Sequence, residues 1–191
     1  MRRAVFLDRD GVLNGLVADP RSGLPESPLH PDEVSLLPGA AAAAARLSEA
    51  GFALVGVSNQ PAAAKGTVTL TELEAVQATV LELLSAAGVS FDGFEICWHH
   101  PDGVVKELAA VCPCRKPAPG MLRRAAAELE LDLGSSWIVG DSDADVLAGR
   151  AAGTRTILIE APGSAHRRSG SVVPDATAAD LAAAAAVIVG S

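Results

Sequence analysis

Two aspartates one residue apart are the residues of this chain best suited to chemistry. Asp8 and Asp10 come directly after the apolar run 4–7 and are followed by Gly11. Residues i and i+2 of an extended segment point the same way, so both carboxylates can face one crevice. Two like charges this close need a cation or a shared proton. The alternative is a solvated turn after a strand, because Asp and Gly are common in turns.

Further polar groups stand at corresponding places along the chain. Ser58 and Asn59 follow one apolar run, Asp141 follows another, and Arg115 and Lys116 precede a helical segment. Carboxylates suit Mg²⁺, while Lys, hydroxyl and amide donors suit phosphate oxygens. A carboxylate can also be the nucleophile, forming an aspartyl-phosphate that water hydrolyses. The set predicts phosphoryl transfer, in which charge neutralisation and positioning supply most of the catalysis.

Three thiols and two imidazoles gather in one segment. Cys97-x-His99 followed by Cys112-x-Cys114 gives a Cys₃His set, which is typical of a tetrahedral structural zinc site. His100 is an alternative to His99 as the fourth ligand. Unligated buried cysteines are the other interpretation, and it suits one cysteine better than three. Since this segment ends directly before the cationic pair named above, we expect zinc to fix that pair.

The elements that must position these groups alternate along the chain. Expected strands, each a short apolar run, cover residues 4–7, 52–57, 94–97, 137–139 and 156–159. Expected helices cover residues 39–50, 71–87, 119–131, 144–152 and 178–187. Such alternation predicts right-handed crossovers and a parallel sheet, with ligands at the carboxyl ends of its strands.

Caps and loops complete this prediction. Thr71 and Glu74 are expected to form the capping box of the second helix. Residues 15–38 and 163–170 are expected to be loops. The longer one is either a substrate-contacting loop or a surface excursion.

Length and composition restrict the classes of function. We expect the 191 residues to form a single domain, 1–191, with a zinc loop at about 97–114. The net charge of −8 and an aromatic content of 3% argue against nucleic-acid binding. The apolar runs are too short for a signal-peptide core or a bilayer span. We therefore expect a cytoplasmic monomer with no membrane partner.

The ordered motifs resemble those of the haloacid dehalogenase-like (HAD) phosphohydrolases. They are Asp8-Arg9-Asp10-Gly11, Ser58-Asn59, Lys116, and Gly140-Asp141 with Asp145. Each motif alone is weak, whereas all four in order are specific. The resemblance implies an α/β fold, a Rossmann-like three-layer sandwich with a central parallel sheet.

The resemblance also implies roles for individual residues. Asp8 would be the nucleophile and Asp10 the general acid/base, with Ser58 and Lys116 holding the phosphoryl group. Mg²⁺ would be bound by Asp8, Asp141 and the backbone carbonyl of Asp10. A nucleophilic carboxylate must be ionised, which Mg²⁺ favours, whereas Asp10 needs a proton for the leaving alkoxide.

The zinc segment 97–114 and the Arg115-Lys116-Pro117 motif that follows it narrow the resemblance to subfamily IIIA of the HAD phosphatases. They are similar to the D-glycero-D-manno-heptose 1,7-bisphosphate 7-phosphatases, and histidinol-phosphatase domains share much of the pattern. This implies a capless Mg²⁺-dependent enzyme that removes the 7-phosphate of the heptose bisphosphate, with histidinol phosphate or another small sugar phosphate as the alternative. Arg115 would contact the substrate, and Asn59 would join it in the binding site. Lys65 stands where this family usually has Arg, which keeps the charge but not the planar fork.

Two other classes of function are compatible with parts of the sequence. A catalytically silent, zinc-stabilised binding module would be expected to lack one of Asp8, Asp10, Lys116 or Asp141, and all four are present. A nucleic-acid end-processing phosphatase would profit from a capless site, but the acidic balance argues against it. The sequence therefore favours a phosphatase for a small phosphorylated sugar.

Overall fold

The structure, a computed structural model, describes residues 1–20 and 22–191, so Arg21 of the predicted loop 15–38 lies outside the described residues. Its strands are β1 (Ala4–Leu7), β2 (Val17–Ala18), β3 (Pro25–Glu26), β4 (Ala53–Asn59), β5 (Gly93–Cys97), β6 (Trp137–Gly140), β7 (Arg155–Ile159) and β8 (Ala176–Ala178). Its α-helices are α1 (Ala40–Glu49), α2 (Leu70–Ala86), α3 (Gly120–Glu128), α4 (Asp143–Ala152) and α5 (Leu181–Val189). Three 3₁₀ helices are η1 (Pro31–Glu33), η2 (Leu133–Ser135) and η3 (Pro162–Arg167).

The main sheet runs in the order β5-β4-β1-β6-β7-β8, and its neighbouring strands are parallel. The central strand β1 pairs with β4 on one side and β6 on the other. The chain fills one side of β1 with β4 and β5 and then crosses over to begin the other side with β6. Such a reversal of strand order opens a crevice at the carboxyl ends of the strands. The predicted parallel α/β architecture is confirmed.

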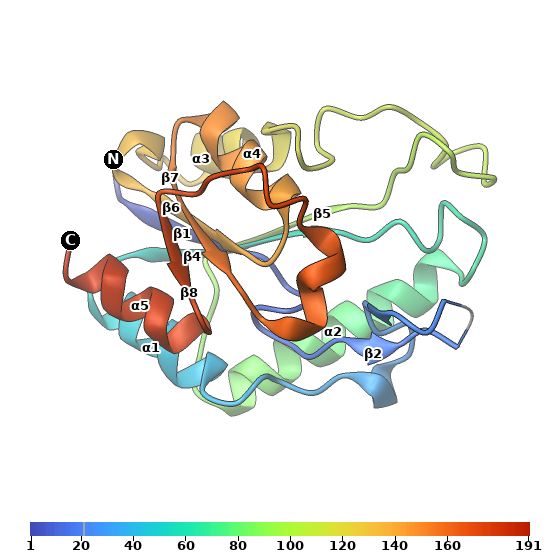
Figure 1. The fold of residues 1–191 in the computed structure, drawn as a ribbon, viewed down its shortest axis with the longest axis horizontal. Coiled ribbons are helices and arrows are strands. Elements are labelled where there is room, and N and C mark those ends of the chain that lie inside the picture. The colour runs from blue at the N-terminus through green and yellow to red at the C-terminus, as the bar shows by residue number, and fades with distance from the viewer. Residues whose placement is uncertain (21) are drawn as a thin grey trace.

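Helices cover both faces of the sheet, which gives the predicted three layers (Figure 1). Alternate β1 residues point to opposite faces, as the strand period requires. Val5 and Leu7 join a buried cluster with α1, α5 and the later part of α2. Ala4 and Phe6 join a second buried cluster with α3 and α4. In the part of the chain that is described, no helix is long and apolar enough to cross a membrane.

The N-cap of helix α2 lies two residues earlier than predicted. Its capping box uses Thr69 and Glu72, with the Thr69 hydroxyl accepting from the Glu72 amide at 3.2 Å. The Glu72 carboxylate accepts in return from the Thr69 amide at 2.7 Å. The prediction of Thr71 and Glu74 was wrong because two Thr-x-x-Glu patterns overlap here, and the earlier one adds helical residues at no cost in capping.

Both predicted loops contain short ordered elements. Residues 15–38 include the antiparallel pair β2–β3 and η1, and residues 163–170 lie largely within η3. The segment that was predicted to begin a last helix at residue 178 instead ends strand β8 there. Runs of two or three residues carry too little periodicity to be predicted from sequence.

We predict that Leu54→Ala destabilises the protein by about 2–5 kcal/mol, because it removes a fully buried side chain from β4 and leaves a cavity. Urea unfolding followed by circular dichroism measures this. Leu81→Ala makes the same chemical change at a helix position that is 39% exposed, and it should cost less than about 1 kcal/mol. Equal losses in both variants would contradict the placement of the core.

Candidate active site

A buried lysine joins the strand ends at the crevice. The Lys116 ammonium donates to the Val57 carbonyl at 2.8 Å and lies 3.0 Å from Asp8 Oδ1 and 2.5 Å from Asp145 Oδ1. Burial alone would lower the pKa of Lys116, but Asp145 and Asp8 outweigh it and raise that pKa above its usual value. The side chain therefore stays protonated between two carboxylates.

Asn59, at the end of β4, fixes the backbone of this lysine. Its amide donates to the Lys116 carbonyl at 2.9 Å and accepts from the Lys116 amide at 3.0 Å. Both ends of the Asn59 side chain are thus occupied by protein. Asn59 lies beside the cleft, as predicted, but these contacts make it a support for Lys116.

The Asp10 carboxylate is surrounded by donors. Arg9 donates to both of its oxygens at 3.0 Å, Asn14 donates at 2.8 Å, and Gln60 donates at 2.5 Å. Burial raises the pKa of Asp10, but the charge of Arg9 and these hydrogen bonds together bring it below its usual value. The structure therefore holds Asp10 ionised, as a general base would be. The sequence had led us to expect a protonated Asp10, which could donate a proton to the leaving alkoxide.

Gln60 and Gln77 have roles that the sequence did not reveal. Gln60 bridges the site, since its amide also donates to Ser58 Oγ at 2.9 Å. Gln77, on α2, accepts from the buried Arg9 guanidinium at 3.3 Å. The adjacency of Gln60 to Ser58 and Asn59 was a usable signal, whereas the position of Gln77 depends on how α2 packs.

Asp141, after β6, is buried without a protein hydrogen bond. Neither of its carboxylate oxygens has a hydrogen-bond partner within the described residues. Burial and the neighbouring Asp8 and Asp145 raise the pKa of Asp141 to about 8, against the opposing charges of Arg167 and Lys116. In the same way burial, Asp145 and Asp10 raise the pKa of Asp8 to about 6, against Lys116.

Such a cluster fits a divalent cation. Oxygens of Asp8, Asp141 and Asp145 lie within 4.8 Å of one another. Asp145 is already used, because it completes the capping box of α4 through Ser142 as well as pairing with Lys116. The orphaned oxygens of Asp141 and the carboxylate of Asp8 are therefore the better ligands for Mg²⁺, which prefers oxygen donors.

Two glycines let the carboxylates approach the backbone. Gly11 has a φ of +87°, and a Cβ there would overlap the Asp141 carboxylate. A Cβ on Gly140 would overlap the Asp145 side chain in the same way. Both acids are thus packed against bare backbone.

The cleft above these residues has a volume of about 340 Å³. Its lining includes, from the predicted set, Asp8, Asp10, Ser58, Asn59, Lys65, Arg115 and Lys116. Glu26 and Ser27 also line the cleft, and both belong to the segment 15–38, for which the sequence offered a substrate-contacting loop as one of two interpretations. Arg167 of η3 lines it too, and the sequence pattern did not indicate this residue. The structure therefore brings most of the predicted site residues to one cleft at the carboxyl end of the sheet.

The predicted zinc ligands lie together beside this cleft. Ligand atoms of Cys97, His99, Cys112 and Cys114 are within 4.8 Å of one another. Burial raises the pKa of the Cys97 thiol. Arg115 follows this group directly and donates to the His99 carbonyl at 3.4 Å. The cluster is therefore connected to a cation of the cleft.

His100 is turned away from this cluster, since its Nδ1 accepts from the Asp102 amide at 3.1 Å. The geometry thus favours His99 as the fourth ligand. Cys112 and Cys114 are joined by a disulfide in the structure. A zinc ion needs both sulfurs as thiolates, so the disulfide and a zinc site are alternative states of the same residues.

We predict that, in Mg²⁺-free buffer, the melting temperature falls as the pH rises from 6 to 8. Asp141 titrates near pH 3.8 when unfolded and near 8 when folded, so the stability of its neutral form is lost as the pH rises through the folded pKa. Thermal melts measure this, and Asp141→Asn should flatten the dependence. Asp102→Asn, at an exposed loop carboxylate, serves as the control. Parallel curves for the wild type and Asp141→Asn would contradict the prediction.

Comparison with known proteins agrees with this geometry. A family model described as HAD-hydrolase-like matches residues 113–184. The chain is 36% identical to D-glycero-beta-D-manno-heptose-1,7-bisphosphate 7-phosphatase of Yersinia pestis, over 90% of this chain and 87% of the relative. The enzyme of that name from Pseudomonas aeruginosa is also 36% identical, over 98% of both chains.

A solved structure shares the whole architecture. The D,D-heptose 1,7-bisphosphate phosphatase from B. bronchiseptica, crystallised with magnesium and phosphate, superimposes with a TM-score of 0.81 at 31% identity. The match covers 98% of both chains. With relatives above 30% identity over nearly their full length, and with Asp8, Asp10 and Lys116 lining one cleft close to Asp141, the chain belongs to the HAD-like D-glycero-beta-D-manno-heptose-1,7-bisphosphate 7-phosphatase family.

Proposed function

We propose that this chain is a Mg²⁺-dependent phosphatase that removes the 7-phosphate of D-glycero-beta-D-manno-heptose 1,7-bisphosphate through an aspartyl-phosphate. One observation carries the mechanism: the Asp8 carboxylate, oriented by Lys116, lines an open cleft close to the Asp141 carboxylate, which has no hydrogen bond among the described residues. The nucleophile Asp8, its counter-ion Lys116 and Asp141, a carboxylate available to bind a metal ion, thus lie close together. The names of the relatives support the substrate.

In the first step Asp8 attacks phosphorus, and the bond between phosphorus and the sugar oxygen breaks. Contacts to Oδ1 from the Arg9 amide at 2.7 Å and from Lys116 at 3.0 Å orient the carboxylate for this attack. Lys116 and Ser58 lie at the cleft to bind the oxygens of the transferring group. The product of the step is a phosphorylated Asp8 and a sugar alkoxide that needs a proton.

Asp10 supplies that proton and later removes one from water. The resting carboxylate is ionised, and a bound phosphate beside it raises its pKa because like charges disfavour ionisation. Asp10 therefore takes up a proton as the substrate binds and gives it to the leaving oxygen. Once ionised again, it deprotonates the water that attacks the aspartyl-phosphate and releases inorganic phosphate.

Mg²⁺ would be held by Asp8, Asp141 and the Asp10 backbone carbonyl, and when bound it neutralises charge on the phosphoryl group and favours ionised carboxylates. The Asp141 oxygens, which lack hydrogen bonds among the described residues, and the magnesium in the B. bronchiseptica complex support this assignment. Asp145 stays with Lys116 and Ser142 as a support.

The remainder of the substrate would contact the cations at the rim. Lys65 lines both the main cleft and an adjoining cavity of about 200 Å³ beside β2 and β3. Arg115 lines the main cleft next to Lys116. Both are placed to bind the phosphate that is not cleaved, and Asn59 acts through the Lys116 backbone.

The test is phosphate release in Mg²⁺ from both anomers of heptose 1,7-bisphosphate, histidinol phosphate and several sugar monophosphates. We expect the highest kcat/KM for the beta bisphosphate. Asp8→Asn should lower kcat about a thousandfold or more while keeping the fold, since the nucleophile is lost.

The other outcomes separate the alternatives. A preference for histidinol phosphate would replace the substrate but keep the chemistry. Activity that survives Asp8→Asn would overturn the mechanism. No release from any substrate would favour a silent binding module, and tight duplex binding with a steep salt dependence would favour nucleic-acid processing.

We also propose that Cys97, His99, Cys112 and Cys114 bind a structural zinc ion that holds the segment leading to Arg115 and Lys116. The Cys₃His composition and the gathered ligand atoms support this. We further propose that residues 1–191 form one domain, and the two buried clusters on opposite faces of one sheet support this.

We predict that protein purified under reducing conditions contains about one zinc ion per chain, as measured by mass spectrometry. His99→Ala should lose zinc and lower the melting temperature, because a ligand of a closed site is removed. His100→Ala, its neighbour outside the cluster, should keep the metal. Zinc loss from His100→Ala alone would reverse the assignment, and zinc-free wild-type protein would contradict the site.

A further inference from the structure

Arg167 is a cation of the cleft that the proposed mechanism does not use. It is the last residue of η3, which follows β7 at the carboxyl edge of the sheet. Its side chain is 18% exposed and lines the same cleft as Asp8 and Lys116. An arginine stays charged at every physiological pH, so a guanidinium this deeply placed needs an anionic partner.

The partners of this guanidinium leave most of its donors free. Its Nη2 donates to Glu26 Oε2 at 3.1 Å, which is its one hydrogen bond among the described residues. Its Nη1 lies 3.6 Å from Asp141 Oδ2, a distance of charge attraction but not of hydrogen bonding. Glu26 is 47% exposed, so its pair with Arg167 is weak and can exchange.

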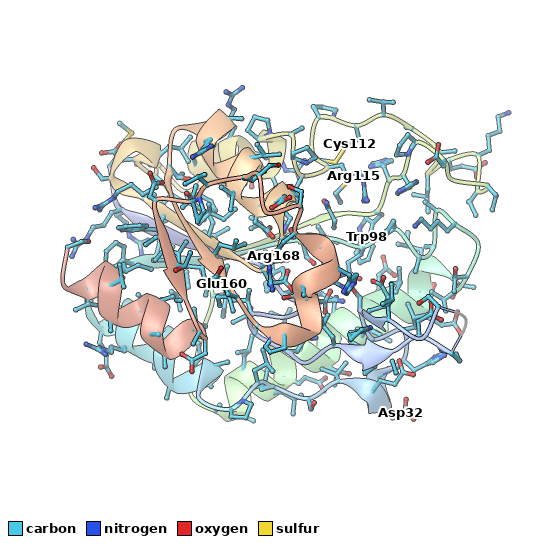
Figure 2. All side chains as sticks on the ribbon, viewed as in Figure 1. Asp32, Trp98, Cys112, Arg115, Glu160 and Arg168 are labelled. Atoms are coloured by element: carbon cyan, nitrogen blue, oxygen red, sulfur yellow. A yellow bond between two sulfur atoms is a disulfide. The ribbon has the colours of Figure 1, made fainter. Side chains whose placement is uncertain are left out.

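The segment that carries Arg167 is firmly anchored. The next residue, Arg168, donates to the Ile159 and Ala161 carbonyls at 3.1 Å and to Ser164 Oγ at 2.9 Å, which ties the end of η3 to its beginning (Figure 2). The Ser169 amide donates to Asp143 Oδ2 at 2.7 Å. Arg167 is therefore presented to the cleft from a fixed base.

The other buried cations of the site are each paired closely with carboxylates. Arg9 is bound to both oxygens of Asp10, and Lys116 lies between Asp8 and Asp145. Arg167 instead faces Asp141, whose oxygens lack hydrogen bonds among the described residues. A metal ion bound to Asp141 would repel the guanidinium, which would then be free to turn to another anion in the cleft.

We propose that Arg167 binds the phosphoryl group that is transferred to Asp8, and that Glu26 holds the guanidinium in place until the phosphate arrives. The inference rests on the proposed function and adds a substrate-binding residue to it. A guanidinium presents paired donors that match two phosphate oxygens, and its charge opposes the charge that develops during transfer.

Inorganic phosphate is the probe, with binding measured by calorimetry on the full chain in saturating Mg²⁺. Arg167→Met should raise the Kd for phosphate about 10- to 100-fold, as expected when charge-assisted hydrogen bonds are lost. Arg167→Lys keeps the positive charge but loses the planar pair of guanidinium donors, so it should raise the Kd for phosphate about threefold or more. Arg123→Met is the matched control, because Arg123 donates to the Ala151 carbonyl and does not line the cleft.

Glu26→Gln separates phosphate binding from a merely structural ion pair. It removes the partner of Arg167 but leaves the guanidinium, so phosphate should bind at least as tightly as to the wild type. If Arg167 served only to hold η3 to β3, Glu26→Gln and Arg167→Met would lower the melting temperature alike and leave the phosphate Kd unchanged. That result would overturn the proposal, and so would wild-type affinity in Arg167→Lys.

The two proposals fail differently. If the wild type binds phosphate through Arg167 but does not hydrolyse heptose bisphosphate, the substrate is wrong and Arg167 keeps its role. If it hydrolyses the bisphosphate while Arg167→Met binds phosphate normally, the substrate stands and the role of Arg167 is wrong. Wild-type protein that binds no phosphate at all would contradict both.

Discussion

The active site depends on one buried ion-pair network, the Lys116 ammonium between Asp8 and Asp145. Through its three contacts, the lysine connects the end of β1, the end of β4 and the start of α4. A buried charge of this kind is tolerated only when its partners are well placed, and removing one partner leaves the others uncompensated. The network therefore fixes the relative positions of the three chain segments that carry the chemistry.

The reversal of strand order beside β1 explains why these segments meet. Because β4 and β6 flank β1, the chain leaves all three strands at one edge, with the peptide group of Asp8 bonded to the Val139 carbonyl at 3.0 Å. Helices on both faces bury the sheet, so the crevice is where polar groups can be exposed without disrupting the core. Burial and the carboxylates gathered there raise the pKa values of Asp8 and Asp141, and the charge of Lys116 opposes both shifts.

The sequence was sufficient to predict the architecture and most of the cleft, because strand ends and helix starts are local features. Asp8, Asp10 and Asp141 each follow an apolar run, and parallel strands bring such ends together. What it did not reveal depends on packing over long distances. Arg167 reaches the cleft from a 3₁₀ helix without periodicity, and Gln77 reaches Arg9 from the middle of α2. The use of both ends of the Asn59 amide by Lys116 likewise follows from two segments that are 57 residues apart.

Gly11 and Gly140 have a consequence for how the energy of catalysis is divided. Because Gly11 and Gly140 have no side chain, Asp141 and Asp145 can pack against the backbone, and the folded chain by itself places both acids within 4.8 Å of Asp8. The work of bringing like charges together is therefore done while the chain folds and not while the substrate reacts. The same repulsion between carboxylates therefore lowers the stability of the metal-free fold and raises its affinity for a metal ion. A variant with its carboxylates farther apart would be more stable without metal but would bind the metal more weakly. This sets an upper limit on how stable the metal-free protein can become while it remains an effective enzyme.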